Sequence, residues 1–243
     1  MSFEPWFREN FDHRVTVIQS HKGFMNEKGE EEFALGDKCK GNQNILEKNR
    51  SYLSESLKMP LIFTAQVHGH KVAHVSDKLA NIPVADGLVS EDFGCALVIL
   101  TADCLPVALF GDQSIGLAHA GWRGLASGIL ERTIEQMIDE PNEISAWLGP
   151  CIGQNSFEVG FDVFRAFENK NQDFIKYFVN IGSGSWLCDL RGLAIAILKL
   201  RKVKAIQSIN APNCTYSDSS FWYSFRRDKT SKRMGTCIYK NNK

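Results

Sequence analysis

Two histidines and one cysteine in this sequence stand where a metal ion could bind. Each lies at the carboxyl side of a short apolar run that is typical of a strand. These residues are His68 after 61–67, Cys104 after 96–100, and His119 at the end of 114–119. Side chains at the ends of neighbouring strands can converge at one edge of a sheet. Two imidazoles and one thiolate are donors that zinc prefers, and three protein ligands leave a fourth position open for catalysis.

The surroundings of these three residues favour a binding site. They lie in QVHGH, TADCLP and HAGWRG, segments that are dense in glycine, aspartate and small side chains. Small residues at strand ends let a substrate approach the backbone closely. A single histidine or cysteine at a strand end is more often a packed or hydrogen-bonded residue than a ligand, so we base the metal site on the three together.

Three further polar residues could take part in chemistry. Asp103, beside Cys104, could orient a ligand or act as a general acid or base, and it could equally be a turn or cap aspartate. Arg123 begins a predicted helix and could hold a phosphate there, or it could be a surface arginine. Arg227 follows the aromatic run at 221–225, which suits a planar base and an anion but also suits a sheet packed on a salt bridge.

Hydrophobic periodicity predicts the elements that would position these residues. Helices are predicted at 44–57, 125–139, 161–169 and 190–202. Strands are predicted at 61–67, 96–100, 106–110, 114–119, 144–148, 204–209, 221–225 and 236–239, whereas the rest of 1–60 reads as polar and irregular. The loops between 61 and 119 are too short for repeated helical crossovers, so we expect a mixed sheet in one α/β domain over 1–243.

The bulk composition excludes several classes of protein. Lys and Arg total 28 and Asp and Glu total 28, without the basic excess of a protein that binds nucleic acid polymers. The longest apolar run, 95–100, is far shorter than the ~20 residues that a membrane helix needs. Seven scattered cysteines without a C-x-x-C pair, and no secretory signal, favour reduced thiols and a cytoplasmic location.

Several segments taken together resemble one known family. They run in order from about 66 to 237: QVHG, ADGLVS, TADCLPV, HAGWRG, WLGPCIG, FEVG, CTYSD and SFRRD. They are similar to the laccase-domain family of multicopper-oxidase type. Its members are described as polyphenol oxidase, as peptidoglycan editing factor, and as purine nucleoside phosphorylase with adenosine deaminase activity.

The resemblance implies a fold and a set of site residues. The family's metal triad carries over as His68, Cys104 and His119, within a compact α/β/β/α domain that is not a cupredoxin. Asn49-Arg50 matches an N-R motif of the family, which adds Arg50 to the candidate binding residues. The N-terminal region departs from the family pattern, because His21 and Ala34 stand where the family has arginine and asparagine.

The leading functional hypothesis follows from this resemblance. It is zinc-dependent cleavage of adenosine, inosine or guanosine by phosphate, with adenosine deamination as a related activity, in a monomer or homodimer. Arg123, with Arg50 or Arg227, would hold the phosphate. Zinc and Asp103 would supply polarisation and proton transfer, beside the catalytic residues Cys104 and His119.

Two other enzyme classes stay open at this point. A copper-dependent polyphenol oxidase could also use two histidines and a cysteine, although six histidines are too few for a four-copper enzyme. Alternatively, Cys104 could be a nucleophile and His119 its base, without metal, in an amide hydrolase that acts on a peptidoglycan precursor.

Overall fold

The computed structural model describes residues 4–11, 14–23, 33–37, 43–76, 81–211 and 213–241. Its strands are β1 (Trp6–Phe11), β2 (Val15–Ser20), β3 (Leu61–Ile62), β4 (Val72–His74), β5 (Gly87–Ser90), β6 (Ala96–Thr101), β7 (Leu105–Phe110), β8 (Ile115–Ala120), β9 (Ser145–Leu148), β10 (Glu158–Gly160), β11 (Phe178–Gly182), β12 (Ser185–Cys188), β13 (Ala205–Ser208) and β14 (Met234–Lys240). Its helices are α1 (Gln43–Leu57), α2 (Trp122–Ser127), α3 (Ile129–Gln136), α4 (Phe161–Lys170), α5 (Leu190–Leu200) and α6 (Phe225–Asp228), with 3-10 turns at Gln154–Ser156 and Gln172–Tyr177.

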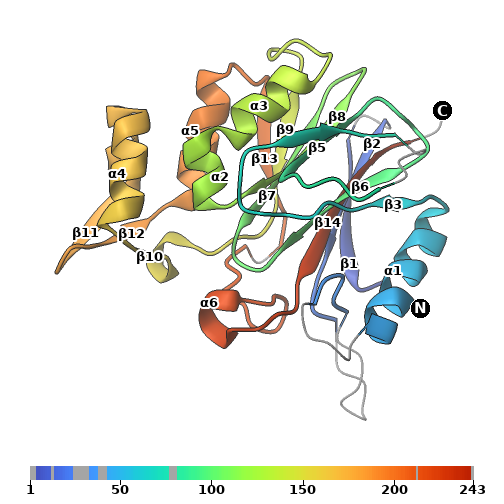
Figure 1. The fold of residues 1–243 in the computed structure, drawn as a ribbon, viewed down its shortest axis with the longest axis horizontal. Helices are drawn as coiled ribbons and strands as arrows, with labels where there is room; N and C mark the ends of the chain where they lie inside the picture. The colour runs from blue at the N-terminus through green and yellow to red at the C-terminus, as the bar shows by residue number, and fades with distance from the viewer. Residues whose placement is uncertain are drawn as a thin grey trace.

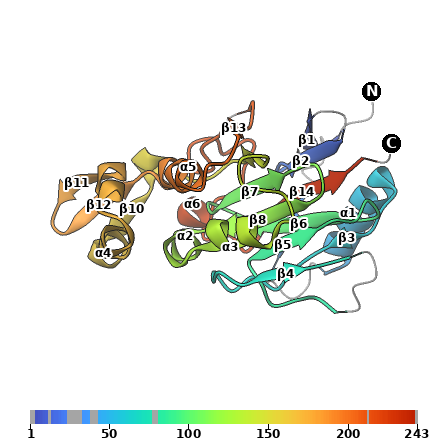
Figure 2. The same ribbon diagram turned by 90° about the horizontal axis from the view of Figure 1, so that it is seen from above.

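Two large sheets stack face to face at the centre of the molecule (Figures 1 and 2). One has the strand order β1-β2-β14-β6-β3, and the other has the order β13-β9-β7-β8-β5-β4. Their inner faces meet in one apolar cluster, to which the first sheet contributes Val17, Ile99 and Ile238. The second sheet contributes Leu117 and Trp147 to the same cluster. Both sheets mix parallel and antiparallel pairs, as the short loops between 61 and 119 predict.

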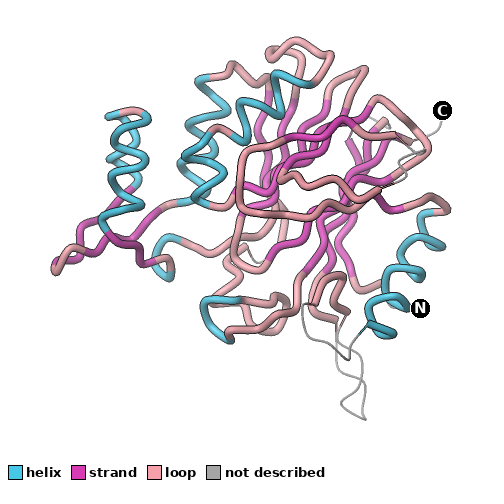
Figure 3. Tube along the Cα trace, viewed as in Figure 1, coloured by secondary structure: helices cyan, strands magenta, loops and turns pink. Residues whose placement is uncertain are grey.

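Helices cover the outer faces of both sheets. The helix α1 buries Leu53 and Leu57 against Ile18 and Val98 of the first sheet. The helices α2, α3 and α5 pack on the outer face of the second sheet in the largest apolar cluster. Figure 3 shows the resulting order of layers, helix, sheet, sheet, helix. The expected α/β/β/α fold class is therefore confirmed.

A smaller unit projects from one end of this sandwich. It consists of the three-stranded sheet β10-β12-β11 and the helix α4, which lie together at the left of Figures 1 and 2. The aromatic rings of Phe164 and Trp186 stack at 4.8 Å between helix and sheet. Sequence periodicity predicts α4 correctly, but it does not reveal the three short strands beside it.

The strand β14, near the end of the chain, occupies the middle of the five-stranded sheet. It pairs antiparallel with β2 on one side and with β6 on the other. Its seven residues are all buried. The strands β2 and β14, which are far apart in the sequence, therefore depend on each other for their backbone hydrogen bonds.

Two predicted elements differ from the structure because of local backbone chemistry. The single helix predicted at 125–139 is two helices, α2 and α3, broken at Gly128, whose φ of 97° ends the first helix. A left-handed residue of this kind is typical of a helix C-cap. The strand predicted at 221–225 is wrong, because the hydroxyl of Ser224 accepts a hydrogen bond from Arg227 N and caps α6 instead.

Long-range contacts explain two further differences. The polar and irregular character expected for 1–60 is wrong for β1 and β2, and all six residues of β2 are buried. The strand predicted at 61–67 is shorter in the structure, where only β3 (Leu61–Ile62) pairs with a neighbouring strand. Side-chain hydrogen bonds hold much of the remainder. Thr64, for example, donates to the Ala85 carbonyl at 2.6 Å.

None of the helices in the described ranges combines the length and the apolar character that crossing a bilayer requires.

Truncation of Leu53 to alanine should destabilise the fold strongly. Leu53 is fully buried between α1 and the five-stranded sheet, so we expect a loss of about 2–5 kcal/mol in the free energy of unfolding. The measurement is urea unfolding followed by circular dichroism. The matched control is Ile45→Ala on the same helix, since Ile45 is 53% exposed and should change stability by less than about 0.5 kcal/mol. Equal effects of the two variants would contradict the proposed packing of α1.

Candidate metal site and substrate cavity

Two of the three predicted metal ligands are placed by a pair of adjacent strands. Cys104 directly precedes β7, and His119 is the penultimate residue of β8. The two strands pair antiparallel, with Leu105 opposite Ala120 and Pro106 opposite His119. Cys104 and His119 are therefore brought to the same edge of the six-stranded sheet by ladder register alone.

The third predicted ligand comes from a loop held by a side chain. His68 lies between β3 and β4 in a left-handed conformation, with φ of 61°. Just before it, the amide of Gln66 donates to the Leu100 carbonyl at 2.9 Å and accepts from Leu100 N at 2.8 Å. The Gln66 side chain thus makes the two hydrogen bonds to Leu100 of β6 that a neighbouring strand would otherwise make. These bonds fix the start of the loop that carries His68.

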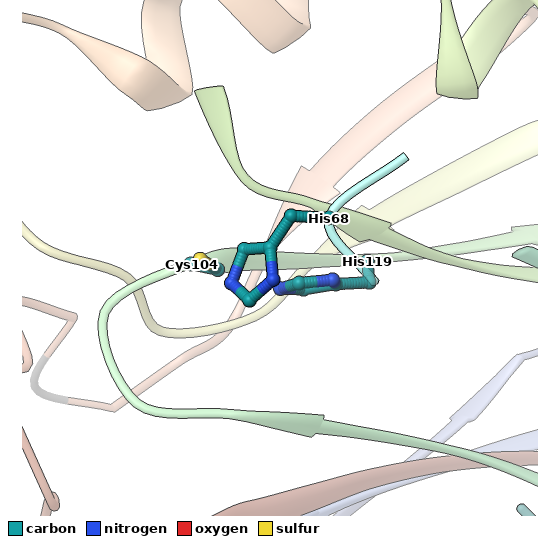
Figure 4. A group of neighbouring side chains, drawn as sticks. All are labelled: His68, Cys104 and His119. Atoms are coloured by element: carbon teal, nitrogen blue, oxygen red, sulfur yellow. The ribbon is translucent and has the colours of Figure 1, made fainter. Parts of the chain in front are cut away.

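The three ligand atoms lie together as the sequence predicts. Those of His68, Cys104 and His119 lie within 4.8 Å of one another. Figure 4 shows the two rings side by side with the Cys104 sulfur beside them, and the ring centroids are 4.7 Å apart. His119 is buried, Cys104 is partly buried and His68 is exposed, so the cluster opens to solvent on the His68 side.

A buried carboxylate, Asp86, joins the segments that carry the two histidines. Its Oδ1 accepts from His68 N at 2.9 Å and contacts His119 Nδ1 at 2.8 Å. Its Oδ2 accepts from the backbone N–H groups of Val67 and Gly69 at 3.1 and 2.8 Å. Sequence reasoning did not single out Asp86, although an aspartate directly before the buried run at 87–90 was a possible signal.

The charge on Asp86 fixes the state of His119. Burial raises the pKa of Asp86, but hydrogen bonds from His119 and the loop N–H groups outweigh it, so the pKa falls below its usual value. An ionised Asp86 keeps a proton on His119 Nδ1, which leaves Nε2 as the ring atom for a metal. A histidine ligand that donates its other nitrogen to a carboxylate is common in zinc sites.

Cys104 is held in a form that suits a metal. Burial raises the pKa of its thiol, yet the charge of His119 and hydrogen bonds from both imidazoles lower it to about 6. The same thiolate, with Asp86, outweighs burial and raises the pKa of His119 to about 9. Room for the sulfur comes from Gly121, where a Cβ atom would lie only 2.9 Å from Cys104 Sγ. The donor set and its spacing fit zinc. The thiolate is the form that binds a metal, whereas His119 would release its Nε2 proton when a metal binds.

Asp103, a predicted catalytic residue, sits in the turn just before Cys104. Its backbone has a φ of 94°, outside the range that most side chains adopt. Its carboxylate accepts hydrogen bonds from Thr215 Oγ1 at 2.7 Å and from Arg226 N at 2.6 Å. Each oxygen keeps a further lone pair, so Asp103 can still accept a proton or a hydrogen bond from a ligand.

A cavity of about 840 Å³ extends from the three-residue cluster. One wall comes from the six-stranded sheet and its helices, and the other comes from the five-stranded sheet and α1. The first wall includes Cys104, His119, Trp122, Ile152, Phe157 and Leu190; the second includes Gly36, Asp37, Arg50, Thr64, Leu100 and Arg233. This volume is in the range of about 300–1,000 Å³ that is usual for small-molecule sites.

The predicted arginines occupy different environments. Arg50 and Arg123 both line the cavity. Arg227 is not among the lining residues, and its guanidinium donates to Thr215, Tyr216, Trp222 and Asp228. These contacts use all five N–H donors of an arginine, so Arg227 braces the segment that contacts Asp103.

Arg233 is a cavity residue that sequence reasoning missed. It lies directly before β14, over the Phe225 ring, and donates from Nη1 to the carbonyls of Thr230 and Lys232. Within the described ranges, neither Arg233 nor Arg50 has a carboxylate within 4 Å. Burial lowers the pKa of both guanidinium groups, although the charges of Cys104, Asp103 and Asp37 oppose this at Arg233 and that of Glu47 opposes it at Arg50. Two poorly hydrated cations therefore face the cavity.

The two positions that depart from the family pattern lie away from the cavity lining. His21 is buried and packs against the rings of Phe7 and Phe221. The carbonyl of Ala34 accepts from the Asn49 side chain at 2.9 Å. Asn49 therefore holds the 33–36 segment together with the Nε of its neighbour Arg50, which donates to the Leu35 carbonyl and also lines the cavity.

Replacement of Asp86 by asparagine should weaken metal binding. The amide cannot accept from His119 Nδ1 and three N–H groups as the carboxylate does, so we expect zinc affinity to fall by about 10- to 100-fold. The measurement is competition with a chelator. The matched control is Asp139→Asn, another buried aspartate, which binds Gln113 and Ser114 at the far end of β8. Loss of affinity in the control alone, or in neither variant, would contradict this role of Asp86.

Comparison with known proteins places the chain in a family. The family model described as "Multi-copper polyphenol oxidoreductase laccase" matches residues 14–241. A Xylella fastidiosa protein named purine nucleoside phosphorylase is 40% identical over 80% of this chain and 78% of its own length. Purine nucleoside phosphorylase YfiH of Escherichia coli is 37% identical over 84% and 85%. A crystal structure of a Neisseria meningitidis protein superposes with a TM-score of 0.91 at 32% identity, covering 98% of this chain and all of that one. The chain therefore belongs to the multi-copper polyphenol oxidoreductase laccase family.

Proposed function

We propose that this chain is a zinc-dependent purine nucleoside phosphorylase, which cleaves adenosine, inosine or guanosine with phosphate into a free base and ribose 1-phosphate. The observation that carries the proposal is the composition of one cavity, where a His-Cys-His cluster and the two partly buried cations Arg50 and Arg233 line the same space. The names of the two relatives described above support the substrate class.

The residues that would hold the metal are His68, Cys104 and His119. When bound, zinc would supply a Lewis acid that polarises a substrate oxygen or acidifies water. We favour zinc over copper because this set is the one cluster of three ligand-type side chains in the described part of the chain. A four-copper oxidase would need several more histidines than the six that the sequence holds.

Arg50 and Arg233 are the best candidates for the phosphate subsite. A partly buried cation is costly unless an anion lies in direct contact with it. No described carboxylate lies within 4 Å of either guanidinium, so an anionic ligand would relieve that cost. Arg50 uses Nε to hold the Leu35 carbonyl at 2.9 Å and lies over the Phe63 ring, so its terminal N–H groups stay available. Two guanidinium groups can bind phosphate in bidentate fashion. The exposed Arg123 would add a third positive charge at the rim.

The apolar wall opposite these cations suits the purine. Trp122, Ile152, Phe157 and Leu190 offer apolar and aromatic surface, which favours a planar base. Asp103 directly precedes Cys104, and its carbonyl accepts from the N–H of Ile152 in this wall at 2.9 Å; lone pairs stay free on its carboxylate. We assign to Asp103 the task of holding or moving a proton on the nucleoside while the glycosidic bond breaks.

Deamination of adenosine is the finer part of the same proposal. It needs a water beside the ring carbon that carries the amine, in a site that also holds the purine. The solvent-exposed side of the cluster at His68 supports access of water. Asp103 would serve as the proton acceptor in this reaction as well.

A metal-free amide hydrolase is the second candidate, and one arrangement favours it. Cys104 hydrogen-bonds His119, which in turn binds Asp86 at 2.8 Å. This order of thiol, imidazole and carboxylate is that of a cysteine nucleophile with an oriented base. His68 has no role in such a triad. We therefore rank the amide hydrolase below the zinc enzyme.

Serine at position 104 should abolish nucleoside turnover. Cys104→Ser replaces the thiolate donor with a hydroxyl that does not ionise at neutral pH, so we expect about one zinc per chain in the parent and much less in the variant. The measurement is metal analysis after dialysis, with chromatography of adenosine and inosine incubated with and without phosphate. Cys188→Ser, at a buried cysteine outside the cavity lining, is the control.

Other outcomes of this experiment would separate the two candidates. Phosphate-dependent release of adenine or hypoxanthine by the parent alone supports the phosphorylase. Full activity of Cys104→Ser would exclude the metal role. Zinc-independent alkylation of Cys104, with both nucleosides unchanged, would favour the amide hydrolase instead.

Removal of either cavity arginine should raise the KM for phosphate. For Arg50→Met and Arg233→Met we expect increases of roughly 10- to 100-fold, the usual loss for a charge-assisted hydrogen bond. Arg201→Met is the matched control, because Arg201 pairs with Glu135 near the end of α5, outside the cavity. The KM for the nucleoside should change less than that for phosphate. Unchanged phosphate dependence in both variants would reject this subsite.

A further inference from the structure

Two cysteines outside the cavity lining face each other across a short backbone bridge. Cys151 and Cys214 are the partners of an isolated parallel bridge. Cys151 N donates to the Asn213 carbonyl at 3.1 Å, and Thr215 N donates to the Cys151 carbonyl at 3.0 Å. Neighbouring strands lie about 5 Å apart, which is inside the Cα–Cα span of roughly 4.4–6.8 Å that disulfides require.

The position of the Cys214 sulfur supports this pairing. A Cβ atom on Gly153 would lie 3.1 Å from Cys214 Sγ, so the sulfur fills the space that a side chain at 153 would occupy. Residues 151 and 153 alternate onto the same face of an extended segment. The Cys214 side chain is therefore directed to the face on which Cys151 projects.

The Cys214 sulfur is surrounded by hydrogen-bond donors. Gly153 N donates to it at 3.3 Å, Ser217 N at 3.5 Å and Ser217 Oγ at 3.4 Å. Burial raises the pKa of the Cys214 thiol, but these donors outweigh burial and lower it below the usual value. A thiol stabilised as thiolate is a better nucleophile toward disulfides.

Solvent access separates Cys214 from most other cysteines. Among the cysteines in the described ranges, Cys95, Cys151, Cys188 and Cys237 are buried, whereas Cys104 and Cys214 are partly accessible. Cys104 belongs to the candidate metal cluster. Cys214 is thus an accessible thiol with stabilising donors and a second thiol opposite it.

We propose that Cys214 and Cys151 form a thiol–disulfide exchange site for low-molecular-weight disulfides of the glutathione type. The Cys214 thiolate attacks one sulfur of the small disulfide, forms a mixed disulfide and releases one small thiolate. The Cys151 sulfur then attacks Cys214 Sγ, forms the Cys151–Cys214 bond and releases the second small thiolate, which takes up the Cys151 proton. The two protein thiols are oxidised by two electrons, and the small disulfide is reduced to two thiols.

The second step is the slower one in this site. Cys151 is buried, and burial raises the pKa of its thiol to about 11, so little thiolate is present at neutral pH. The guanidinium of Arg191 lies 3.8 Å from Cys151 Sγ and favours loss of its proton. The mixed disulfide at Cys214 therefore precedes the internal disulfide in time.

The bridge lies next to the residues that hold Asp103. Ile152 N donates to the Asp103 carbonyl at 2.9 Å, and Thr215 Oγ1 donates to the Asp103 carboxylate at 2.7 Å. An internal disulfide would fasten these two neighbouring segments to each other. The exchange chemistry itself does not depend on what the cavity binds.

The test is exposure of the zinc-saturated protein to oxidised glutathione at neutral pH, followed by intact mass and peptide mapping. We expect a transient glutathione adduct on Cys214 and then a product lighter by two hydrogen atoms, in which the peptides of 151 and 214 are linked. Cys151→Ser should stop at the adduct, and Cys214→Ser should form neither product. Cys237→Ser, at a buried cysteine of β14, should react like the parent.

A second variant keeps the test independent of large structural changes. Ser217→Ala removes one donor from the Cys214 sulfur and should slow formation of the adduct by roughly 3- to 10-fold. The proposal is overturned if glutathione attaches only to other cysteines, if Cys214→Ser gives the linked product with a third cysteine at the parental rate, or if Ser217→Ala reacts as fast as the parent.

Discussion

The shared carboxylate of Asp86 is the interaction on which the geometry of the site depends. Burial of an ionised group is tolerated only when its lone pairs are satisfied, and here two segments of the chain satisfy them together. The loop at 67–69 turns its N–H groups inward to Asp86, and this contact offsets the strain of a left-handed histidine. Because β5 begins right after Asp86 and pairs with β8, the same carboxylate also ties the loop to the sheet that carries His119.

The cavity arises where the two layers of the sandwich meet, and each layer brings a different chemistry. The six-stranded sheet brings a thiolate, an imidazole and an apolar wall. The five-stranded sheet and α1 bring the cations Arg50 and Arg233. Neither layer alone has both halves of a site for a nucleoside and an anion, so the packing of one sheet on the other is itself part of the proposed function.

Local patterns were enough to predict much of the fold and part of the site. The apolar runs at 96–100 and 144–148 and the periodic helices at 44–57 and 190–202 are determined by their own residues. The three ligand-type residues could be grouped because each ends such a run. Their convergence is confirmed, whereas the roles of Asp103, Arg50 and Arg123 stay proposals.

The features that sequence reasoning missed depend on partners far along the chain. The strand β2 has a short β-branched run, VTVI, that sequence reasoning passed over, whereas the burial of its Gln19 depends on Thr236 of β14, which donates to it at 2.6 Å. The contacts of Asp86 with His68 and His119, and the place of Arg233 in the cavity, likewise depend on segments that lie far away in the sequence. The aromatic run at 221–225 has the composition of a strand, but one serine at its end caps a helix instead.

The central place of β14 has a consequence for how the protein folds. Before β14 docks, β1-β2 and β6-β3 are separate pairs, each with an open edge that can recruit other chains. The five-stranded sheet is therefore complete only when β14 docks between these pairs, and Arg233, directly before β14, reaches the cavity in the same event. A chain cut before β14 would lack the strand that joins the two halves of the sheet, and both open edges would stay exposed to other chains.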